Sequence, residues 1–223
     1  MRHIVGLGGG GTDEQIDLLF GYVLGLTGKD RPRLLLVPTA SAEEEEFIAW
    51  FLERTAPRAE VTVLRTCPWP PADLRDVVLA QDAIFVSGGS TANMLALWRV
   101  HGIDTLMREA WEQGVVLSGW SAGMICWFEH GITDSFGPQL EAMECLGFLP
   151  GSACPHYDGE EKRRPRYTEL VRGGLPAGIA ADDGVGVHFV DTELVEVVAC
   201  REGAAAHRVT PDGEDVIHPR LLG

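Results

Sequence analysis

The sequence predicts an α/β fold in which a mostly parallel sheet carries helices on both faces. Short apolar runs rich in valine, isoleucine and leucine alternate with segments whose apolar residues recur every three or four positions. These are the patterns of buried strands and of amphipathic helices. Glycine-rich turns follow several of the strand-like runs. Because 223 residues suit one α/β domain, we expect a single domain over residues 1–223 with a β-rich C-terminal end.

The first five expected strands are short and apolar, and helix-like segments separate them. The strands are expected at residues 4–7, 33–37, 61–64 and 83–86 and in the run that begins at Val115. The helices are expected at residues 13–26, 43–53, 72–80, 92–100 and 104–113, and residues 122–128 are expected to start a last, apolar helix. Ser41 is placed to cap the second of these helices.

The last part of the chain predicts mainly strands. Residues 178–190 read as a strand, an acidic turn that contains Asp182 and Asp183, and a second strand. Residues 194–199 and 206–209 resemble the antiparallel strands of a terminal hairpin region. Strands that alternate with helices and end in such a tail favour a mostly parallel sheet that is covered on both sides.

Composition and charge exclude several functional classes. The net charge of −15 argues against nucleic-acid binding and against attraction to anionic membranes. No apolar run approaches the roughly 20 residues needed to span a bilayer, and no signal-peptide pattern begins the chain, so we expect a cytoplasmic protein. The five cysteines are odd in number and scattered, which indicates neither a disulfide framework nor a zinc site. We expect no metal and no cofactor.

The strongest local motif is Gly-Trp-Ser-Ala-Gly at residues 119–123. It lies between a strand-like run and a helix-like run, as in a G-x-S-x-G elbow. A serine at such a tight turn projects its hydroxyl above the sheet edge and needs small residues on either side. Ser121 is therefore the candidate nucleophile. The helix that begins at Ala122 offers its unpaired N–H groups to a developing oxyanion.

Two other glycine-rich turns follow strands. Residues 87–91, Ser-Gly-Gly-Ser-Thr, repeat the layout of the elbow and either supply a second oxyanion donor or form a merely tight turn. Residues 6–11 formally match the dinucleotide fingerprint G-x-G-x-x-G, but the acidic residue at the right distance, Asp30, lies in a turn over residues 28–30 and not at the end of a second strand. The alternative for this first loop is a position at the carboxyl edge of the sheet, lining a substrate cleft.

A nucleophilic serine needs an imidazole base and usually a carboxylate that orients it. Of the seven histidines, His3 lies at the start of the first strand, and His188 belongs to a strand in which it is expected to be packed or exposed. Four lie near helix ends or in the tail: His101, His130, His207 and His218. His156 stands in an irregular loop after Pro155 and is the candidate base.

These motifs together resemble the peptidase E family. The elbow, residues 87–91, Thr133-Asp134 and Pro155-His156-Tyr157 occur in the same order and at similar spacing as in that family, across about residues 1–200. Its members are serine peptidases with a class I glutamine amidotransferase-like fold, a flavodoxin-like three-layer sandwich. They include alpha-aspartyl dipeptidase and, more distantly, cyanophycinase. The resemblance implies a peptidase acting on short peptides and a homodimer.

The resemblance also implies roles for individual residues. Ser121 would be the nucleophile and His156 the general base, and the backbone oxyanion donors would be Gly89 and Ala122. The third member of the triad stays open. Asp134 matches the acid of the aspartyl dipeptidases, whereas Asp183 matches the glutamate position of the cyanophycinase-like relatives.

A basic cluster follows the candidate base. In the aspartyl dipeptidases, an arginine in a Gly-Glu-Thr-Arg setting binds the aspartate side chain of the substrate. Here Lys162 stands at the matching position, with Arg163 and Arg164 directly after it. Lysine cannot reproduce a bidentate grip on a carboxylate, so Asp-X specificity stays open. The alternative is a solvated helix start whose cations balance Glu160 and Glu161.

Three functions are compatible with these patterns. The leading hypothesis is a serine peptidase with acyl-enzyme chemistry. An esterase or amidase would use the same triad, and a catalytically silent domain of the same fold could bind an anionic metabolite at the first glycine loop. A glutamine amidotransferase is disfavoured because that chemistry uses cysteine at the elbow, where this chain has Ser121.

Overall fold

The computed structural model describes all 223 residues and contains two sheets. The larger has eight strands in the order β14-β11-β10-β1-β5-β4-β2-β3. Their bounds are β1 His3–Leu7, β2 Arg33–Val37, β3 Glu60–Val63, β4 Ala83–Val86, β5 Val116–Trp120, β10 Val185–Val190, β11 Glu193–Ala199 and β14 Arg220–Leu221. The run from β1 through β5, β4 and β2 to β3 is parallel, and β10 pairs antiparallel with β1. The α/β architecture predicted from the sequence is confirmed.

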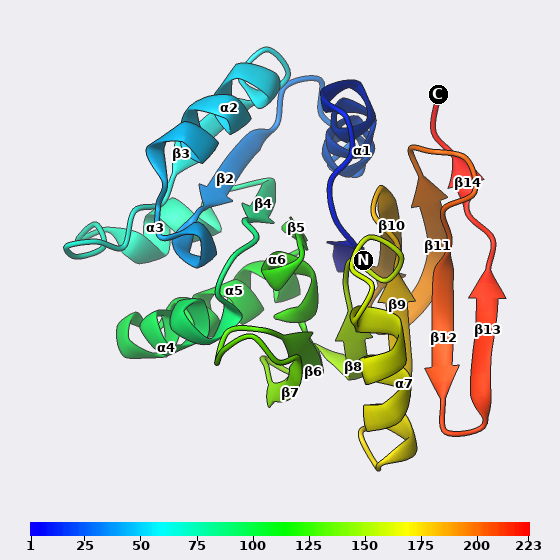
Figure 1. Ribbon diagram of the computed structural model, residues 1–223. Coiled ribbons are helices and arrows are strands. Elements are labelled where there is room, and N and C mark those ends of the chain that lie inside the picture. Colours follow the sequence, from blue (N-terminus) through cyan, green and yellow to red (C-terminus); the bar gives the residue numbers. More distant parts are fainter.

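The central strands are apolar on both sides because helices cover both faces of the sheet. Along β2, Leu35 and Val37 pack into one core cluster, whereas Leu34 and Leu36 pack into another. The helices are α1 Asp13–Gly25, α2 Glu45–Thr55, α3 Leu74–Leu79, α4 Thr91–His101, α5 Ile103–Glu112, α6 Ala122–Ile125 and α7 Arg163–Arg172. Figure 1 shows α1 and α2 on one side of β2, and α4 and α5 on the other. Successive side chains of a strand point to opposite faces of the sheet, so a strand that is covered on both faces must be apolar at nearly every position.

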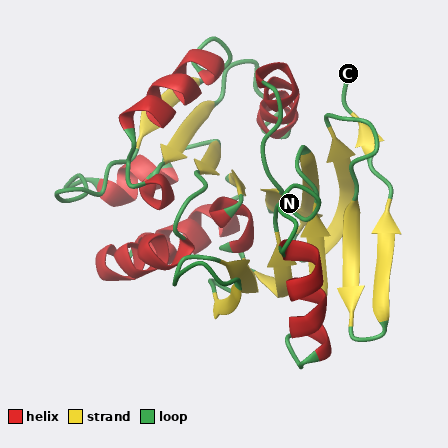
Figure 2. Cartoon of the chain, viewed as in Figure 1, coloured by secondary structure: helices red, strands yellow, loops and turns green.

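The second sheet was not expected. It has six strands in the order β13-β12-β9-β8-β6-β7. Their bounds are β6 Phe128–Thr133, β7 Glu141–Glu144, β8 Leu149–Cys154, β9 Gly178–Ala181, β12 Ala206–Thr210 and β13 Gly213–Ile217. One face joins the larger core through Leu149 and Ala153, and α7 covers the other face with Tyr167 and Val171. Figure 2 shows that strands dominate this side of the molecule, with α7 lying across them.

The helix after the elbow is much shorter than expected. It ends at Ile125, and β6 begins at Phe128. The Trp127 carbonyl accepts hydrogen bonds from the N–H groups of Phe148 and Leu149, and the Cys126 carbonyl accepts one from Leu146. A longer helix would have needed these carbonyls for its own bonds, so pairing with residues 146–149 ends it.

Two other local expectations are wrong. Ser41 caps no helix, because its hydroxyl donates to the Pro38 carbonyl within a short 3-10 turn, Thr39–Ser41. The α2 helix begins only at Glu45. Residues 194–199 and 206–209 do not pair with each other, since β11 belongs to the first sheet and β12 to the second. The C-terminal hairpin is formed instead by β12 and β13.

The carboxyl ends of the parallel strands position the candidate site. Leu7, Val86 and Trp120 end β1, β4 and β5 at one edge of the sheet, and these strands are neighbours. Each is followed by one of the glycine-rich turns found in the sequence. None of the helices has the length and apolar character needed to cross a membrane.

Candidate active site

Ser121 occupies a strained turn between β5 and α6. Its φ of 53° and ψ of −110° lie in a region that residues with a side chain rarely adopt. A Cβ atom at Gly119 would lie 2.5 Å from the Val86 carbonyl oxygen, and one at Gly123 would lie 2.3 Å from it. Both glycines of the elbow are therefore needed, because the end of β4 packs too closely against them for a side chain. The Ser121 hydroxyl makes no hydrogen bond within the protein and is partly exposed.

His156 lies just beyond β8, with its imidazole held by a carboxylate. Its Nδ1 lies 2.7 Å from Asp183 Oδ1. A carboxylate accepts a hydrogen bond and cannot donate one when ionised, so Nδ1 carries the proton and Nε2 is left as the acceptor. The imidazole side chain is 22% exposed. This arrangement presents a basic nitrogen to solvent and to any bound substrate.

The end of β1 holds both residues. The Ser121 N–H donates to the Leu7 carbonyl at 3.1 Å, and the His156 N–H donates to the next carbonyl, that of Gly8, at 2.9 Å. No hydrogen bond joins the Ser121 hydroxyl to His156. Such bonds are often long or absent without substrate and tighten when it binds.

Two glycines enclose the Asp183 carboxylate. A Cβ atom at Gly9 would lie 1.7 Å from Asp183 Oδ1 and 2.5 Å from His156 Nδ1. On the other side, a Cβ atom at Gly159 would lie 2.0 Å from Asp183 Oδ2. Neither glycine has a positive φ, so close contact rather than backbone conformation excludes a side chain at these positions.

The first glycine loop thus forms a wall of the site. Gly8 is equally crowded, because its Cβ would lie 2.3 Å from the Asp182 carbonyl oxygen. The N-terminus of α1 is closed by a capping box in which Thr12 and Gln15 bond each other's backbone N–H groups. A pyrophosphate would need these donors and this space, so the packing favours the cleft-lining alternative over a dinucleotide site.

A pair of charged side chains fixes the backbone of Asp183. The Asp183 N–H donates to Asp158 Oδ1 at 2.9 Å, and the Asp183 carbonyl accepts from Arg201 Nε at 2.9 Å. Arg201 also forms an ion pair with Asp158. The two side chains therefore connect the segment of His156, the turn of Asp183 and the end of β11. The sequence pattern predicted no role for Asp158 or Arg201. The one available indication was that Asp158 stands two residues after the candidate base His156.

Asp134 lies elsewhere. It is exposed in the loop after β6, and its side chain makes no hydrogen bond and no ion pair. The next residue, Ser135, accepts a hydrogen bond from the Ala92 N–H at 3.3 Å, which places this loop beside the start of α4. Of the two carboxylates that the sequence left open, the structure brings Asp183 to His156.

The two candidate oxyanion donors come from different turns. Gly89 has a φ of 128°, and a Cβ atom there would lie 2.0 Å from the Ala40 carbonyl oxygen. The Gly89 N–H donates to no group of the protein, whereas the following Ser90 N–H bonds the Ala40 carbonyl. Ala122 is the first residue of α6, where an N–H has no partner within the helix. A Cβ atom at Gly88 would lie 3.4 Å from Ser121 Cβ, so the two turns are in contact.

The three residues of the basic cluster, Lys162, Arg163 and Arg164, differ in their burial and in their partners. Arg163 is buried, pairs with Glu160 at 2.8 Å and donates to the Ile132 carbonyl at 3.0 Å. Arg164 forms an ion pair with Glu214 and lies over the Tyr157 ring. Lys162 alone is exposed and unpaired, and it lines a hollow of about 310 Å³ together with Pro138, Gln139, Leu140 and Arg166. Only this member of the cluster has a free head group for a substrate.

His188 is packed in a polar chain on the opposite end of the sheet. Its Nε2 lies 2.9 Å from His3 Nδ1, and its Nδ1 lies 2.7 Å from the Tyr22 hydroxyl, which donates to Glu196. Burial lowers the pKa of His188 to about 4, and the neighbouring His3 adds to the effect. The ring is therefore neutral at physiological pH.

Comparison with known proteins identifies the family of this chain. Residues 4–197 match the family model of Peptidase family S51. The chain belongs to this family. Family S51 is a family of serine-type peptidases, so the chain is a serine-type peptidase, and the resemblance to peptidase E seen in the sequence is confirmed.

Two related proteins also match this chain in sequence. The chain is 44% identical to "Uncharacterized peptidase YgaJ" of Bacillus subtilis (strain 168) over 213 residues, covering 94% of this chain and 92% of that protein. It is 27% identical to "Peptidase E" of Shewanella denitrificans over 158 residues, or 66% of this chain and 65% of that protein.

Solved structures share the fold at low sequence identity. A peptidase from an acI-B1 Actinobacterium superposes with a TM-score of 0.72 at 19% identity, covering 98% of this chain and 95% of the other. A putative peptidase E protein from Listeria monocytogenes EGD-e gives a TM-score of 0.65 at 17% identity, with 87% and 97% covered. The S51 peptidase therefore has the architecture of peptidase E structures.

Proposed function

We propose that this S51 peptidase hydrolyses short peptides, as a dipeptidase, through a triad of Ser121, His156 and Asp183. The observation that carries the proposal is the hydrogen bond of 2.7 Å between His156 Nδ1 and Asp183 Oδ1. The backbone N–H groups of His156 and of the strained Ser121 also bond consecutive carbonyls at the end of β1. This is the constellation that activates a serine hydroxyl.

The proposed reaction begins with attack of Ser121 Oγ on the scissile carbonyl carbon. His156 Nε2 takes the hydroxyl proton, and the negative charge of Asp183 favours the imidazolium that forms. The carbonyl oxygen becomes an oxyanion, for which the N–H groups of Gly89 and Ala122 are the proposed donors. Both donors are preorganised, because one lies in a turn packed on Ala40 and the other begins a helix.

Collapse of this intermediate breaks the peptide bond. His156 returns its proton to the leaving amine, and the acyl group stays esterified to Ser121. Water then gives a proton to His156 Nε2 and attacks the ester carbonyl. As the second intermediate collapses, His156 returns this proton to Ser121 Oγ, which releases the acid and restores the hydroxyl and the free base. The complete reaction consumes one water molecule for each peptide bond and needs no other reactant.

Lys162 is the proposed contact for an acidic substrate group. It is the free cation of the cluster, whereas Arg163 and Arg164 are held by Glu160 and Glu214. A single ammonium attracts a carboxylate without the fixed geometry of a guanidinium. We therefore propose that acidic dipeptides are accepted and that Asp-X is preferred less strictly than a bidentate arginine would impose. The homodimer implied by the family resemblance stays a prediction.

The test is hydrolysis of a panel of Asp-X, Glu-X and neutral X-Y dipeptides by wild type and Ser121→Ala. Ser118→Ala is the matched control, since Ser118 lies on the same strand but is buried and donates to the Ile84 carbonyl. We expect cleavage by wild type and by the control, and none by Ser121→Ala. Cleavage of esters but of no dipeptide would assign an esterase. If no substrate were cleaved and a fluorophosphonate did not label Ser121, the catalytic proposal would fail.

A further inference from the structure

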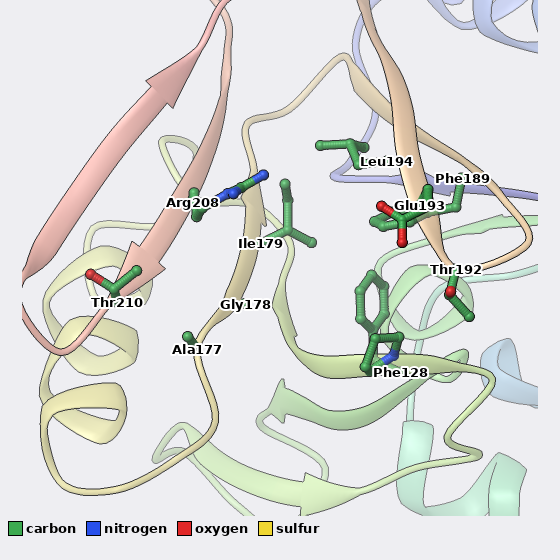
Figure 3. Close-up of a pocket in the computed structure, with 11 residues that line it drawn as sticks. Phe128, Ala177, Gly178, Ile179, Phe189, Thr192, Glu193, Leu194, Arg208 and Thr210 are labelled. Atoms are coloured by element: carbon green, nitrogen blue, oxygen red, sulfur yellow. The ribbon is translucent and has the colours of Figure 1, made fainter.

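A second hollow, of about 290 Å³, lies between the two sheets. None of its lining residues belongs to the candidate active site. Strands β9 and β12 of the second sheet form one side, and β10 and β11 of the first sheet form the other (Figure 3). Its volume is just below the roughly 300–1,000 Å³ of ligand pockets, so a small ligand of metabolite size would fill it.

The floor of the hollow is apolar. It is lined by Phe128, Ile179, Phe189 and Leu194. The rings of Phe128 and Phe189 meet edge to face with centroids 5.6 Å apart. The pairing of β10 with β11 is irregular just at Phe189, between the His188–Glu196 and Phe189–Leu194 pairs. An irregularity of this kind redirects side chains, and such features often adjoin functional sites.

Opposite charges stand on the two sides of this floor. Arg208 comes from β12 and Glu193 from β11, and Figure 3 shows the Arg208 guanidinium pointing into the hollow from the side opposite Glu193. The two do not form an ion pair with each other, and neither pairs with any other side chain, although most arginines of this chain are ion-paired. The site thus presents a free cation, a free anion and an apolar surface between them.

We propose that this hollow binds a free α-amino acid with an apolar side chain. Arg208 would bind the α-carboxylate through its planar fork of donors, and Glu193 would accept hydrogen bonds from the α-ammonium group. The apolar side chain would lie on Phe128, Ile179 and Leu194. A simple anion would leave Glu193 unsatisfied and repelled, whereas a zwitterion satisfies both charges. Binding at this place does not depend on the proposed catalytic function. If that function holds, the ligand is also of the class that dipeptide cleavage releases.

The test is isothermal titration of the full chain with L-leucine and L-phenylalanine, and with two blocked analogues, N-acetyl-L-leucine and L-leucine amide. We expect saturable binding of the free amino acids. Arg208→Gln and Glu193→Gln should each weaken it by about tenfold or more, the effect of losing one charge-assisted hydrogen-bond partner. Arg172→Gln is the matched control, because Arg172 is an exposed, unpaired arginine at the end of α7, outside this hollow.

The analogues separate the two contacts. N-acetyl-L-leucine has no ammonium group and is repelled by Glu193, so its affinity should not fall in Glu193→Gln but should still be reduced by Arg208→Gln. The amide should show the reverse. His156→Ala, which alters the candidate active site, should leave leucine binding unchanged.

Three outcomes would overturn the proposal. The first is that wild type gives no saturable heat up to about 10 mM amino acid. At that concentration even a site with a Kd of about 1 mM would be largely occupied. The second is binding that survives both hollow variants but is lost in His156→Ala, which would assign it to the active site. The third is a change of oligomeric state in Arg208→Gln without any amino-acid binding to wild type, which would assign the hollow to contact with a second copy of the chain.

Discussion

Gly9 lies against the Asp183 carboxylate so closely that a Cβ atom at residue 9 would be 1.7 Å from Asp183 Oδ1. The same Cβ would be 2.5 Å from His156 Nδ1, so the glycine touches the bond that orients the proposed base. Since real Cβ contacts are never this short, a methyl group here must displace the carboxylate, the imidazole or the loop. The first glycine loop is thereby coupled to the proposed chemistry without supplying a reacting group.

Gly9→Ala should lower kcat by about a hundredfold or more, because a misplacement of about 1 Å at a catalytic pair costs that much. Gly25→Ala is the matched control: Gly25 ends α1, and a Cβ there would meet nothing within 4 Å. The measurement is dipeptide hydrolysis, with circular dichroism to verify that both variants fold. Equal activity of the two alanine variants would contradict the proposed role of this contact.

The two candidate carboxylates should behave differently. Asp183→Asn should lower kcat by about a thousandfold to ten-thousandfold, because an amide at this place no longer selects the tautomer with a free Nε2. Asp134→Asn should stay within a few fold of wild type, since the Asp134 side chain is exposed and without a hydrogen bond. The comparison uses kcat for the best dipeptide of the panel. A larger loss in Asp134→Asn than in Asp183→Asn would reverse the assignment.

Asp158 and Arg201 should act as positioning residues. Arg201→Gln and Asp158→Ala each remove one of the side-chain bonds that hold the Asp183 backbone, so we expect kcat to fall by about tenfold to a hundredfold with little change in KM. Asp158→Asn keeps an acceptor oxygen and should be milder than Asp158→Ala.

Two comparisons separate this role from a general loss of stability. Arg75→Gln breaks an exposed ion pair with Glu109, far from the site in sequence and on other elements, and should leave kcat unchanged. The double variant Asp158→Ala with Arg201→Gln should lose less than the product of the single losses, because both act on one carboxylate. Additive losses would show that the two residues act independently of each other, and a rise in KM alone would argue for direct contact with substrate.

The polar chain around His188 predicts a pH dependence of stability. Burial lowers the pKa of His188 from its ordinary 6.5 to about 4, so between these values the unfolded chain binds a proton that the native protein does not. The contribution of neutral His188 is therefore complete above pH 6.5 and falls as the pH drops towards about 4, by at most about 1.4 kcal/mol per pH unit.

The measurement is urea unfolding of wild type and His188→Gln at several pH values between 7 and 4. The difference in the free energy of unfolding isolates His188 from Glu196 and the other carboxylates, because these are common to both proteins. His3 and Tyr22, which face the ring, are also unchanged. We expect the wild-type advantage to shrink steadily as the pH falls. Parallel stability curves would show that His188 has the same pKa in the native and unfolded states and would contradict the prediction.

The sequence determined the local features that depend on residue type and spacing. The inner parallel strands are largely apolar because both faces are buried, whereas the edge strand β3 alternates in burial. The alternation of these strands with helices predicts the α/β class. Gly119, Ser121 and Gly123 predict a tight turn because only small residues permit the approach of Val86. The family was also predictable, since several linked motifs are far more specific than one.

The tertiary structure decided what depends on contacts between distant segments. The chain from Ala122 was apolar enough for a helix, but pairing with residues 146–149 turned it into a strand after one turn. Asp134 and Asp183 were equivalent by motif, and only the placement of the β9–β10 turn beside β8 brings Asp183 to His156. Asp158 and Arg201 had no pattern of their own, because a bond between residues 43 positions apart leaves no periodicity in the sequence. Local pattern thus determined which elements form, and packing determined which side chains meet.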